Sequence, residues 1–159
     1  LTLLSNTKSF DPRAFELVNK TNQFNLNGQH YTEKEWGDAL TQETCFLLMA
    51  SSEDKYGPLG KIAVLLGQYQ EGTCVVNTWV MSCRAFSRRI EYKCLEYLFN
   101  HFGIEEVRFD FQATPKNEPF QEFFKILLGE KPQSAHRISR KQFFQKCPTL
   151  FHQVKEIKL

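Results

Sequence analysis

Residues 79–91 read WVMSCRAFSRRIE, and this stretch joins the end of an apolar strand to the start of an amphipathic helix through a basic turn. Three arginines crowd the turn, namely Arg84, Arg88 and Arg89. A helix start carries unpaired N–H groups and the positive end of the helix dipole, and guanidinium groups hold phosphate oxygens by paired hydrogen bonds. The stretch therefore predicts an anion-binding turn; the alternative is a solvated helix start whose arginines pair with Glu91.

The chain before this turn is predicted to form two helices and then an antiparallel meander. Asp11 and Pro12 suit the cap and first position of a helix, and Thr32 with Glu35 forms a capping box. Apolar runs predict buried strands, and the short link 70–72 suits a hairpin. The expected elements are a strand at Leu3–Leu4, helices over 12–20 and from Thr32, strands over 44–50, 60–69 and 73–82, and a loop over 51–58.

After the turn, the spacing of apolar residues changes between helical and strand periods. Residues 88–102 carry one apolar helical face that Gly103 ends, and residues 106–111 alternate as a strand does. Residues 120–128 predict a further packed helix that ends at Gly129. The tail is expected to hold a helix or a strand over 138–144 and a final strand over 151–159.

This order of elements predicts an α/β (α+β) fold, with a mixed central β-sheet that contains an antiparallel meander and is flanked by helices. The layout resembles that of GNAT-type acyltransferases. No internal repeat, low-complexity segment or linker interrupts the sequence, so residues 1–159 are expected to form a single domain.

Composition narrows the class of protein. Hydrophobic residues make up 42% and charged residues 24% of the 159 residues, as in soluble globular domains, and a net charge of +2 gives no reason to expect a nucleic-acid partner. No run reaches the ~18 apolar residues that a membrane helix needs. The five cysteines are odd in number and form no C-x-x-C pair, so we expect reduced thiols, a cytoplasmic location and no metal.

Four segments resemble the FkbH family in sequence and in order. Residues 19–25 read NKTNQFN, residues 81–84 read MSCR before the basic turn, and residues 54–60 and 113–119 read DKYGPLG and ATPKNEP. The chain is similar to the C-terminal, GNAT-like half of that family. The family's Asp-rich HAD motif is missing here, so the chain is expected to be a fragment of a longer HAD–GNAT protein.

The resemblance implies a function and partners. FkbH-type proteins load a glyceryl unit from a phosphorylated glycerate onto an acyl carrier protein, in polyketide or related pathways. The implied cofactor is coenzyme A or a phosphopantetheine arm. The implied partners are an acyl carrier protein and a linked or separate HAD-like domain, with no nucleic acid and no membrane.

The resemblance also implies cofactor-binding residues. In GNAT enzymes a Q/R-x-x-G-x-G/A turn cradles pyrophosphate; here the pattern starts at Arg84, and its glycine positions hold Ser87 and Arg89. A cleft is expected between the strand ending at Met81 and the strand ending near Phe111. The implied cofactor-binding set is Cys83, Arg84, Ala85, Phe86, Ser87, Arg88, Arg89 and Asn117, where Asn117 matches an asparagine that meets the pantetheine arm.

The sequence gives less specific support for substrate-binding and catalytic residues than for the cofactor-binding set. The substrate-binding candidates are Asn19, Thr21, Asn22, Gln23 and Asn25, whose uncharged polar groups suit a hydroxylated acyl group or a pantetheine amide. The alternative is that these side chains cap backbone groups in a loop. The catalytic candidates are His30 and Cys83, whereas Phe124 occupies the position of a Tyr acid and cannot donate a proton.

Two functions follow from this sequence. The first is an acyltransferase domain that grips a phosphopantetheine thioester. The second is a non-catalytic module that docks the carrier protein for a separate HAD domain. A basic tail of Arg137, Arg140, Lys141 and Lys146 is a candidate docking patch for an acidic carrier protein, and the alternative is a solvated face. A third reading is a GNAT enzyme that acts on an unrelated amine or sugar.

Overall fold

The computed structural model describes residues 1–5 and 10–158, and the elements lie in the expected order. They are β1 (Thr2–Ser5), α1 (Pro12–Lys20), β2 (Phe24–Asn25), α2 (Glu33–Leu40), β3 (Cys45–Asp54), β4 (Gly57–Gln70), β5 (Thr73–Met81), a 3-10 turn (Cys83–Ala85), α3 (Ile90–Phe102), β6 (Glu106–Phe109), α4 (Glu118–Leu128), β7 (His136–Ser139), α5 (Arg140–Lys146) and β8 (Lys155–Lys158).

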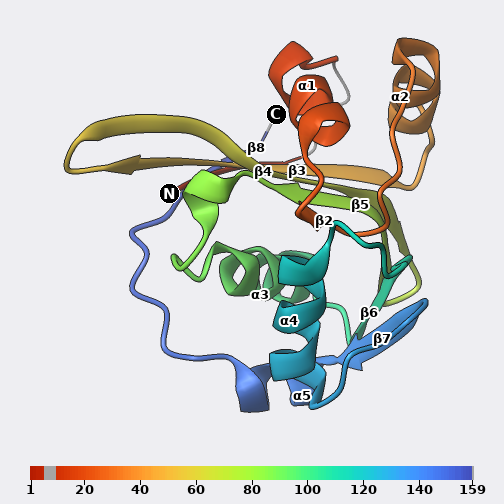
Figure 1. The fold of residues 1–159 in the computed structure, drawn as a ribbon, viewed down its shortest axis with the longest axis vertical. Coiled ribbons are helices and arrows are strands. Elements are labelled where there is room, and N and C mark those ends of the chain that lie inside the picture. Colours follow the sequence, from red (N-terminus) through yellow and green to blue (C-terminus); the bar gives the residue numbers. More distant parts are fainter. Residues whose placement is uncertain (6–9, 159) are drawn as a thin grey trace.

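One mixed sheet organises these elements, with strand order β7-β6-β5-β4-β3-β1-β8. The neighbours β3, β4 and β5 form the antiparallel meander, and β6 runs parallel to β5. Helices α1 and α2 cover one face of the sheet, and α3 and α4 cover the other (Figure 1). The predicted fold class is therefore confirmed.

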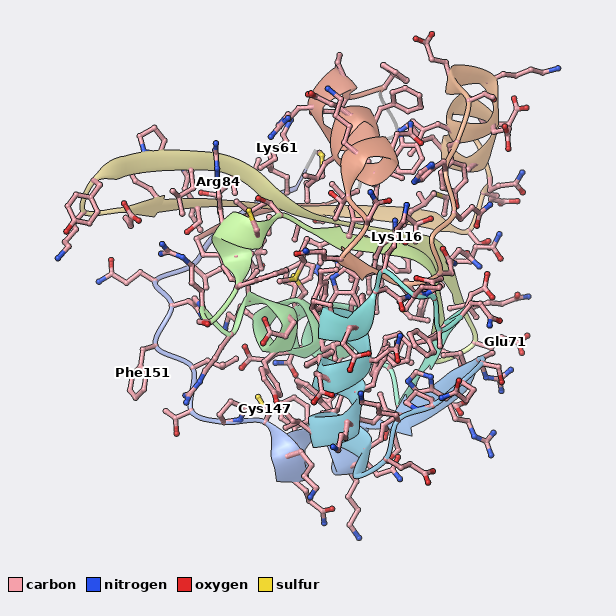
Figure 2. All side chains as sticks on the ribbon, viewed as in Figure 1. Lys61, Glu71, Arg84, Lys116, Cys147 and Phe151 are labelled. Atoms are coloured by element: carbon pink, nitrogen blue, oxygen red, sulfur yellow. The ribbon has the colours of Figure 1, made fainter. Side chains whose placement is uncertain are left out.

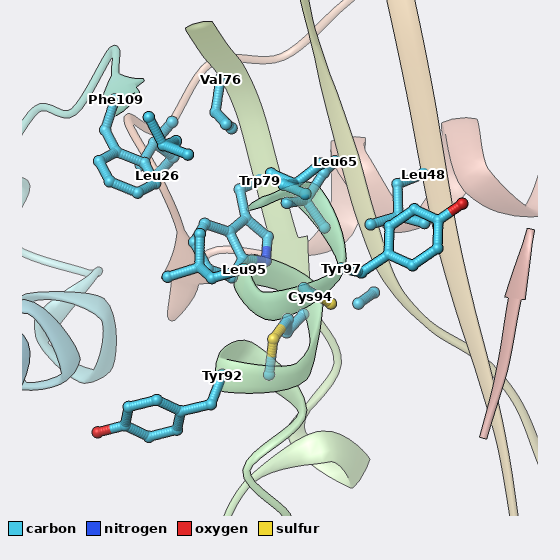
Figure 3. Close-up of a cluster of buried hydrophobic side chains, with 14 of the residues drawn as sticks. Leu26, Leu48, Leu65, Val76, Trp79, Tyr92, Cys94, Leu95, Tyr97 and Phe109 are labelled. Carbon is cyan, nitrogen blue, oxygen red and sulfur yellow. The ribbon is translucent and has the colours of Figure 1, made fainter. Parts of the chain in front are cut away.

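Each face of the sheet packs its own apolar core. On the first face, Trp36 of α2 and Val18 of α1 lie buried against Val80 of β5. On the second face, Trp79 of β5 lies beside Leu95 of α3 (Figure 3). Neighbouring β5 residues point to opposite faces because strand side chains alternate, so β5 belongs to both cores.

Several expected boundaries differ in the structure. The final strand, expected from residue 151, begins at Lys155. Residues 51–58 form a hairpin rather than a loop, because backbone pairing between β3 and β4 continues through this polar stretch as far as Asp54 and Gly57. This hairpin extends away from the body of the domain (Figure 1). Strand β6 ends at Phe109 instead of 111. In the tail, both alternatives occur in turn, because Ser139 ends β7 and caps α5 in a capping box with Gln142.

A β-bulge at Asn77 sets the geometry of the later site. In the β4–β5 ladder, Gly67 pairs with Val76 and Leu66 pairs with Thr78, so Asn77 is the extra residue. A Cβ on Gly67 would lie 2.1 Å from the Val75 carbonyl oxygen, so only glycine permits this close approach. Bulges bend the strand that carries them, and β5 leaves β6 at this point: their pairing stops at Val76 and Phe109.

Candidate functional site

The turn between β5 and α3 has the backbone of a glycine turn without the glycines. Ser87 and Arg89 adopt left-handed φ angles of 61° and 57°, and among the described non-glycine residues only Glu71 shares this feature. Left-handed backbone costs a residue with a side chain about 1–2 kcal/mol. The sequence pattern predicts glycine at these two positions, and their backbone is of the kind that glycine adopts most readily.

The three arginines of the turn bind other segments of the chain. The Arg84 guanidinium donates to the Leu59 carbonyl (3.2 Å) on the hairpin, and Arg88 pairs with Asp54 on the same hairpin (3.1 Å). Figure 2 shows Arg84 projecting from the turn on the hairpin side. Arg89 donates to the Thr149 carbonyl (2.9 Å) near the C-terminus. The arginines therefore clamp two distant segments and keep further donors for a ligand.

Two cavities open beside Ser87. The first, of about 240 Å³, lies between the starts of α3 and α4, is mainly apolar, and has Phe24 and Tyr92 in its wall. The second, of about 310 Å³, is also mainly apolar, and its wall includes Arg88, Arg89 and His152 beside Thr149 and Phe151. Two cavities that share Ser87, the second with two guanidinium groups in its wall, suit a ligand with an apolar arm and an anionic end.

The expected cleft between β5 and the segment after β6 is filled by the chain itself. Strand β2 pairs with the free edge of β5, with Phe24 opposite Met81 and Asn25 opposite Val80. The Leu26 N–H donates to the Trp79 carbonyl (2.9 Å). The prediction of an open cleft is therefore wrong for this structure, because residues 24–27 satisfy the backbone groups that the parting strands leave free.

The other side of this inserted segment meets the chain after β6. The Gln112 N–H donates to the Leu26 carbonyl (3.2 Å), and the Asn27 side-chain amide donates to the carbonyls of Asn77 and Asp110 (both 2.9 Å). Asn27 thus bridges β5 and the segment after β6 at the point where the two strands part.

Asn117 lies beside the same segment and is completely buried. Its side-chain amide donates to the carbonyls of Asn25 (3.0 Å) and Gln112 (2.9 Å), and its side-chain oxygen accepts from the Thr114 N–H (2.8 Å) and from Gln121 (2.8 Å). Asn117 therefore lies where a pantetheine arm was expected, but it binds the chain's own segment there.

At both ends of the polar stretch 19–25, side chains form hydrogen bonds with backbone groups. The Asn19 side-chain oxygen accepts from the Tyr31 N–H (2.8 Å), and buried Asn25 accepts from the Asn27 and Gly28 N–H groups. Asn25 also donates to the Thr21 carbonyl (2.9 Å). The structure places Asn22 and Gln23 on the surface. The alternative of a capped loop thus describes Asn19 and Asn25, while Asn22 and Gln23 stay available to a ligand.

The two catalytic candidates, His30 and Cys83, lie in different segments of the chain. His30 is exposed between β2 and α2, and no described cavity is lined by it. Cys83 is an exposed free thiol at the first position of the 3-10 turn. Phe124, at the position of the Tyr acid, lies in the aromatic core against Phe109 and Phe111.

A polar groove on the α1–α2 face was missed by sequence reasoning. A cavity of about 320 Å³ there is lined by Tyr31, Gln68, Asn77 and Asp110, among others. The Tyr31 hydroxyl shares a hydrogen bond with the Thr78 hydroxyl, and burial raises the pKa of Tyr31, so the phenol is protonated at neutral pH. The available signal was Asn77, an amide within a mainly apolar strand.

A larger cavity of about 580 Å³ lies next to this groove. It shares Asn77 and Asp110 with the groove and adds Arg108, Arg137 and His136. Burial lowers the pKa of the His136 imidazole to about 4, where Phe109 and Phe124 surround the ring. His136 is therefore a neutral wall of this cavity at physiological pH.

The basic tail is only partly free to dock a partner. The Arg140 guanidinium donates to the carbonyls of Phe99 (2.9 Å) and Ile104 (3.3 Å), so it caps the end of α3. Arg137 pairs with Glu106 at 3.4 Å. Lys141 and Lys146 are exposed on α5.

Comparison with known proteins places the fold. The spermidine/spermine N-acetyltransferase SpeG from Vibrio cholerae, in a mutant form, matches with a TM-score of 0.58 and 10% identity over 90% of this chain and 95% of that one. A second mutant of spermidine N-acetyltransferase SpeG from the same organism matches with a TM-score of 0.55 and 11% identity over 89% and 94%. The chain therefore has the fold of GNAT acetyltransferases, and identity at this level shows the fold alone.

No protein-family model matches the chain, and no curated protein matches its sequence.

Within residues 1–5 and 10–158, no group of three or more His, Cys, Asp or Glu side chains is arranged to hold a metal ion. No helix in the described part of the chain has the length and apolar character needed to cross a bilayer.

Proposed function

We propose that this chain is an acyltransferase-type domain that binds a phosphopantetheine thioester, carried by coenzyme A or by an acyl carrier protein. The observation that carries the proposal is the left-handed backbone of Ser87 and Arg89 in a basic turn that leads into α3. The N–H groups of Arg84, Ala85, Phe86 and Arg88 donate within the turn itself. The groups proposed to meet a pyrophosphate are therefore the arginine side chains and the first turn of α3, which the strained backbone positions.

Different residues of this chain would hold different parts of the ligand. The turn and the arginines would hold the phosphates, and the apolar cavity beside Tyr92 would receive part of the arm. A thioester supplies an activated acyl group, and an acceptor could reach it through the groove lined by Asn77 and Asp110. Protonated Tyr31 is available in that groove as a hydrogen-bond donor.

The finer assignment is to an FkbH-like protein, with a carrier protein and a HAD-like domain as partners. Its support is that all four segments carrying the resemblance meet at one place. Asn25 pairs with β5 beside Met81, and Asn117 donates to Asn25. Hairpin residues Asp54 and Leu59 contact the basic turn through its arginines. Contacts around the end of β5 thus link segments that lie 100 residues apart at their extremes (19–119), which supports the finer assignment.

A non-catalytic module that docks a carrier protein for a HAD domain is the second candidate. Two observations favour it: residues 24–27 fill the gap between the parting strands, and Phe124 stands where a Tyr acid was expected. Acyl transfer from a panel of acyl-coenzyme A and acyl-carrier-protein thioesters separates the two candidates. Binding without transfer would select the module.

A matched pair of variants at Ser87 tests the proposal. Glycine adopts the left-handed backbone freely, whereas a β-branched side chain resists it. Calorimetric titration with coenzyme A should show that Ser87→Gly retains binding and Ser87→Val loses about tenfold or more in affinity, about 1.4 kcal/mol. Equal affinity in both folded variants, or no binding in the unmodified protein, would overturn the proposal.

A further inference from the structure

The segment 24–27 is held by hydrogen bonds on both of its sides. Its ladder with β5 covers Phe24 and Asn25, and a further backbone bond joins Leu26 to Trp79. On the other side, the Gln112 N–H donates to the Leu26 carbonyl and the Asn117 amide donates to the Asn25 carbonyl. Phe24 and Leu26 are buried, and Phe24 stacks on Phe120 at 4.2 Å between ring centres. On one side the segment continues into exposed residues 22–23, and on the other into Gly28 with a φ of 73°.

A phosphopantetheine arm and this segment need the same edge of β5. The arm carries two amides in an extended chain, which pair with a free strand edge as a peptide strand does. That edge, over residues 79–81, is occupied by β2 and Leu26. The apolar cavity beside Ser87 ends at Phe24, so a longer arm entering there meets this side chain first. Both occupants cannot be present together.

We infer that residues 24–27 form a displaceable gate. The Asn27 side chain is one of the groups that hold the gate closed, and the segment must leave β5 before a phosphopantetheine arm can lie along that strand edge. This inference rests on the proposed function and adds its regulation. Asn27 is a latch because its amide spans the carbonyls of Asn77 and Asp110, one on each side of the parting strands. A ligand in the polar groove also contacts this place, because Asn77 and Asp110 line it.

The first measurement is hydrogen exchange of the full chain with and without saturating coenzyme A. If the gate opens, the amides of residues 24–27 exchange faster when coenzyme A is bound, although most amides at a binding site become slower. Unchanged or slower exchange of these amides in the coenzyme A complex would overturn the gate while leaving the proposed function intact.

The second measurement is the affinity for coenzyme A of Asn27→Ala beside Gln145→Ala. Gln145 is exposed on α5, so its truncation is a matched loss of a polar side chain away from the site. A weaker latch raises the population of the open state, and Asn27→Ala should bind about tenfold more tightly while Gln145→Ala binds as the unmodified protein does. If Asn27→Ala does not fold, the exchange measurement on the unmodified chain decides alone. Absence of coenzyme A binding in all three proteins would refute the gate and the proposed function together.

Discussion

At the scale of single residues, Asn117 carries more of the fold than its place in a sequence motif suggests. Its four side-chain hydrogen bonds join the start of α4 to the last residue of β2 and to the chain after β6. A buried polar group that loses its partner costs about 1–3 kcal/mol. The residue was predicted to contact a cofactor because spacing alone cannot distinguish a ligand contact from a contact within the chain.

Replacement of Asn117 by Ala should therefore destabilise the protein. We expect a loss of about 3 kcal/mol in the free energy of unfolding, since several buried carbonyl and N–H groups are left without partners. Urea unfolding measures this loss, and Lys116→Ala is the control because Lys116 is the exposed neighbour. A change of less than about 1 kcal/mol in Asn117→Ala would contradict the structural role.

His136 gives a second prediction at this scale. Burial lowers the pKa of its imidazole from 6.5 to about 4 in the folded state. The unfolded chain therefore takes up this proton first, and the stability from the neutral ring is present above pH 6.5 and is lost as the pH falls towards 4. Between pH 7 and pH 5 the unfolding free energy should fall by about 1–2 kcal/mol from this residue after allowance for solvent screening.

The control for this pH dependence is His136→Phe, which suits the ring cluster with Phe109 and Phe124. Chemical unfolding at pH 7, 6 and 5 should show a flatter pH dependence in the variant than in the unmodified protein. Parallel pH profiles of the two proteins would show that His136 does not supply this loss.

At the scale of elements, the bulge in β5 is the feature that separates β5 from β6. It depends on Gly67, where an added Cβ would lie 2.1 Å from the Val75 carbonyl oxygen and 2.9 Å from the Phe46 ring. Neither neighbour can move without disturbing the ladder. Sequence reasoning identified both strands but not the bulge, because an apolar run shows which residues are buried and not which residue is left unpaired.

Two glycine-to-alanine changes should thus have opposite effects. Gly67→Ala is expected to lower the unfolding free energy by about 1–3 kcal/mol through overpacking at the bulge. Gly37→Ala, in the interior of α2 with nothing within 4 Å of the new Cβ, should raise it by about 0.5–1 kcal/mol because alanine loses less backbone freedom in a helix. Thermal unfolding of the two variants gives the signs, and a neutral Gly67→Ala would mean that the bulge tolerates a side chain.

Strand β2 shows where sequence reasoning fails on elements. Helices α3 and α4 and the meander were predictable from apolar spacing, since each buries a long regular face. Strand β2 has two residues in a polar stretch, and its partners in β5 lie more than 50 residues later in the chain. No local pattern encodes that pairing, so the sequence could not show that β2 occupies the cleft beside β5.

At the scale of the whole molecule, the basic turn joins two distant segments of the chain. Arg84 and Arg88 attach the β3–β4 hairpin, and Arg89 attaches the segment before β8, where Phe151 projects outward (Figure 2). The sequence predicted the position and charge of this turn correctly. It could not show that the arginines already have partners, because Asp54 and Thr149 belong to elements whose distance from the turn is set by the sheet.

An anionic ligand at the turn must therefore compete with the hairpin for Arg88. The Asp54→Asn change removes the competing carboxylate, and we expect coenzyme A to bind about threefold more tightly, the size of a partly exposed ion pair. Glu53→Gln is the control, because Glu53 is the exposed neighbour on the same hairpin and its loss changes the net charge by the same amount. Calorimetric titration of both variants at one salt concentration separates release of Arg88 from a general charge effect. If the two variants gained equally, the pair with Asp54 would have no specific part in binding, and the hairpin would act on the turn only through the bond from Arg84 to the Leu59 carbonyl.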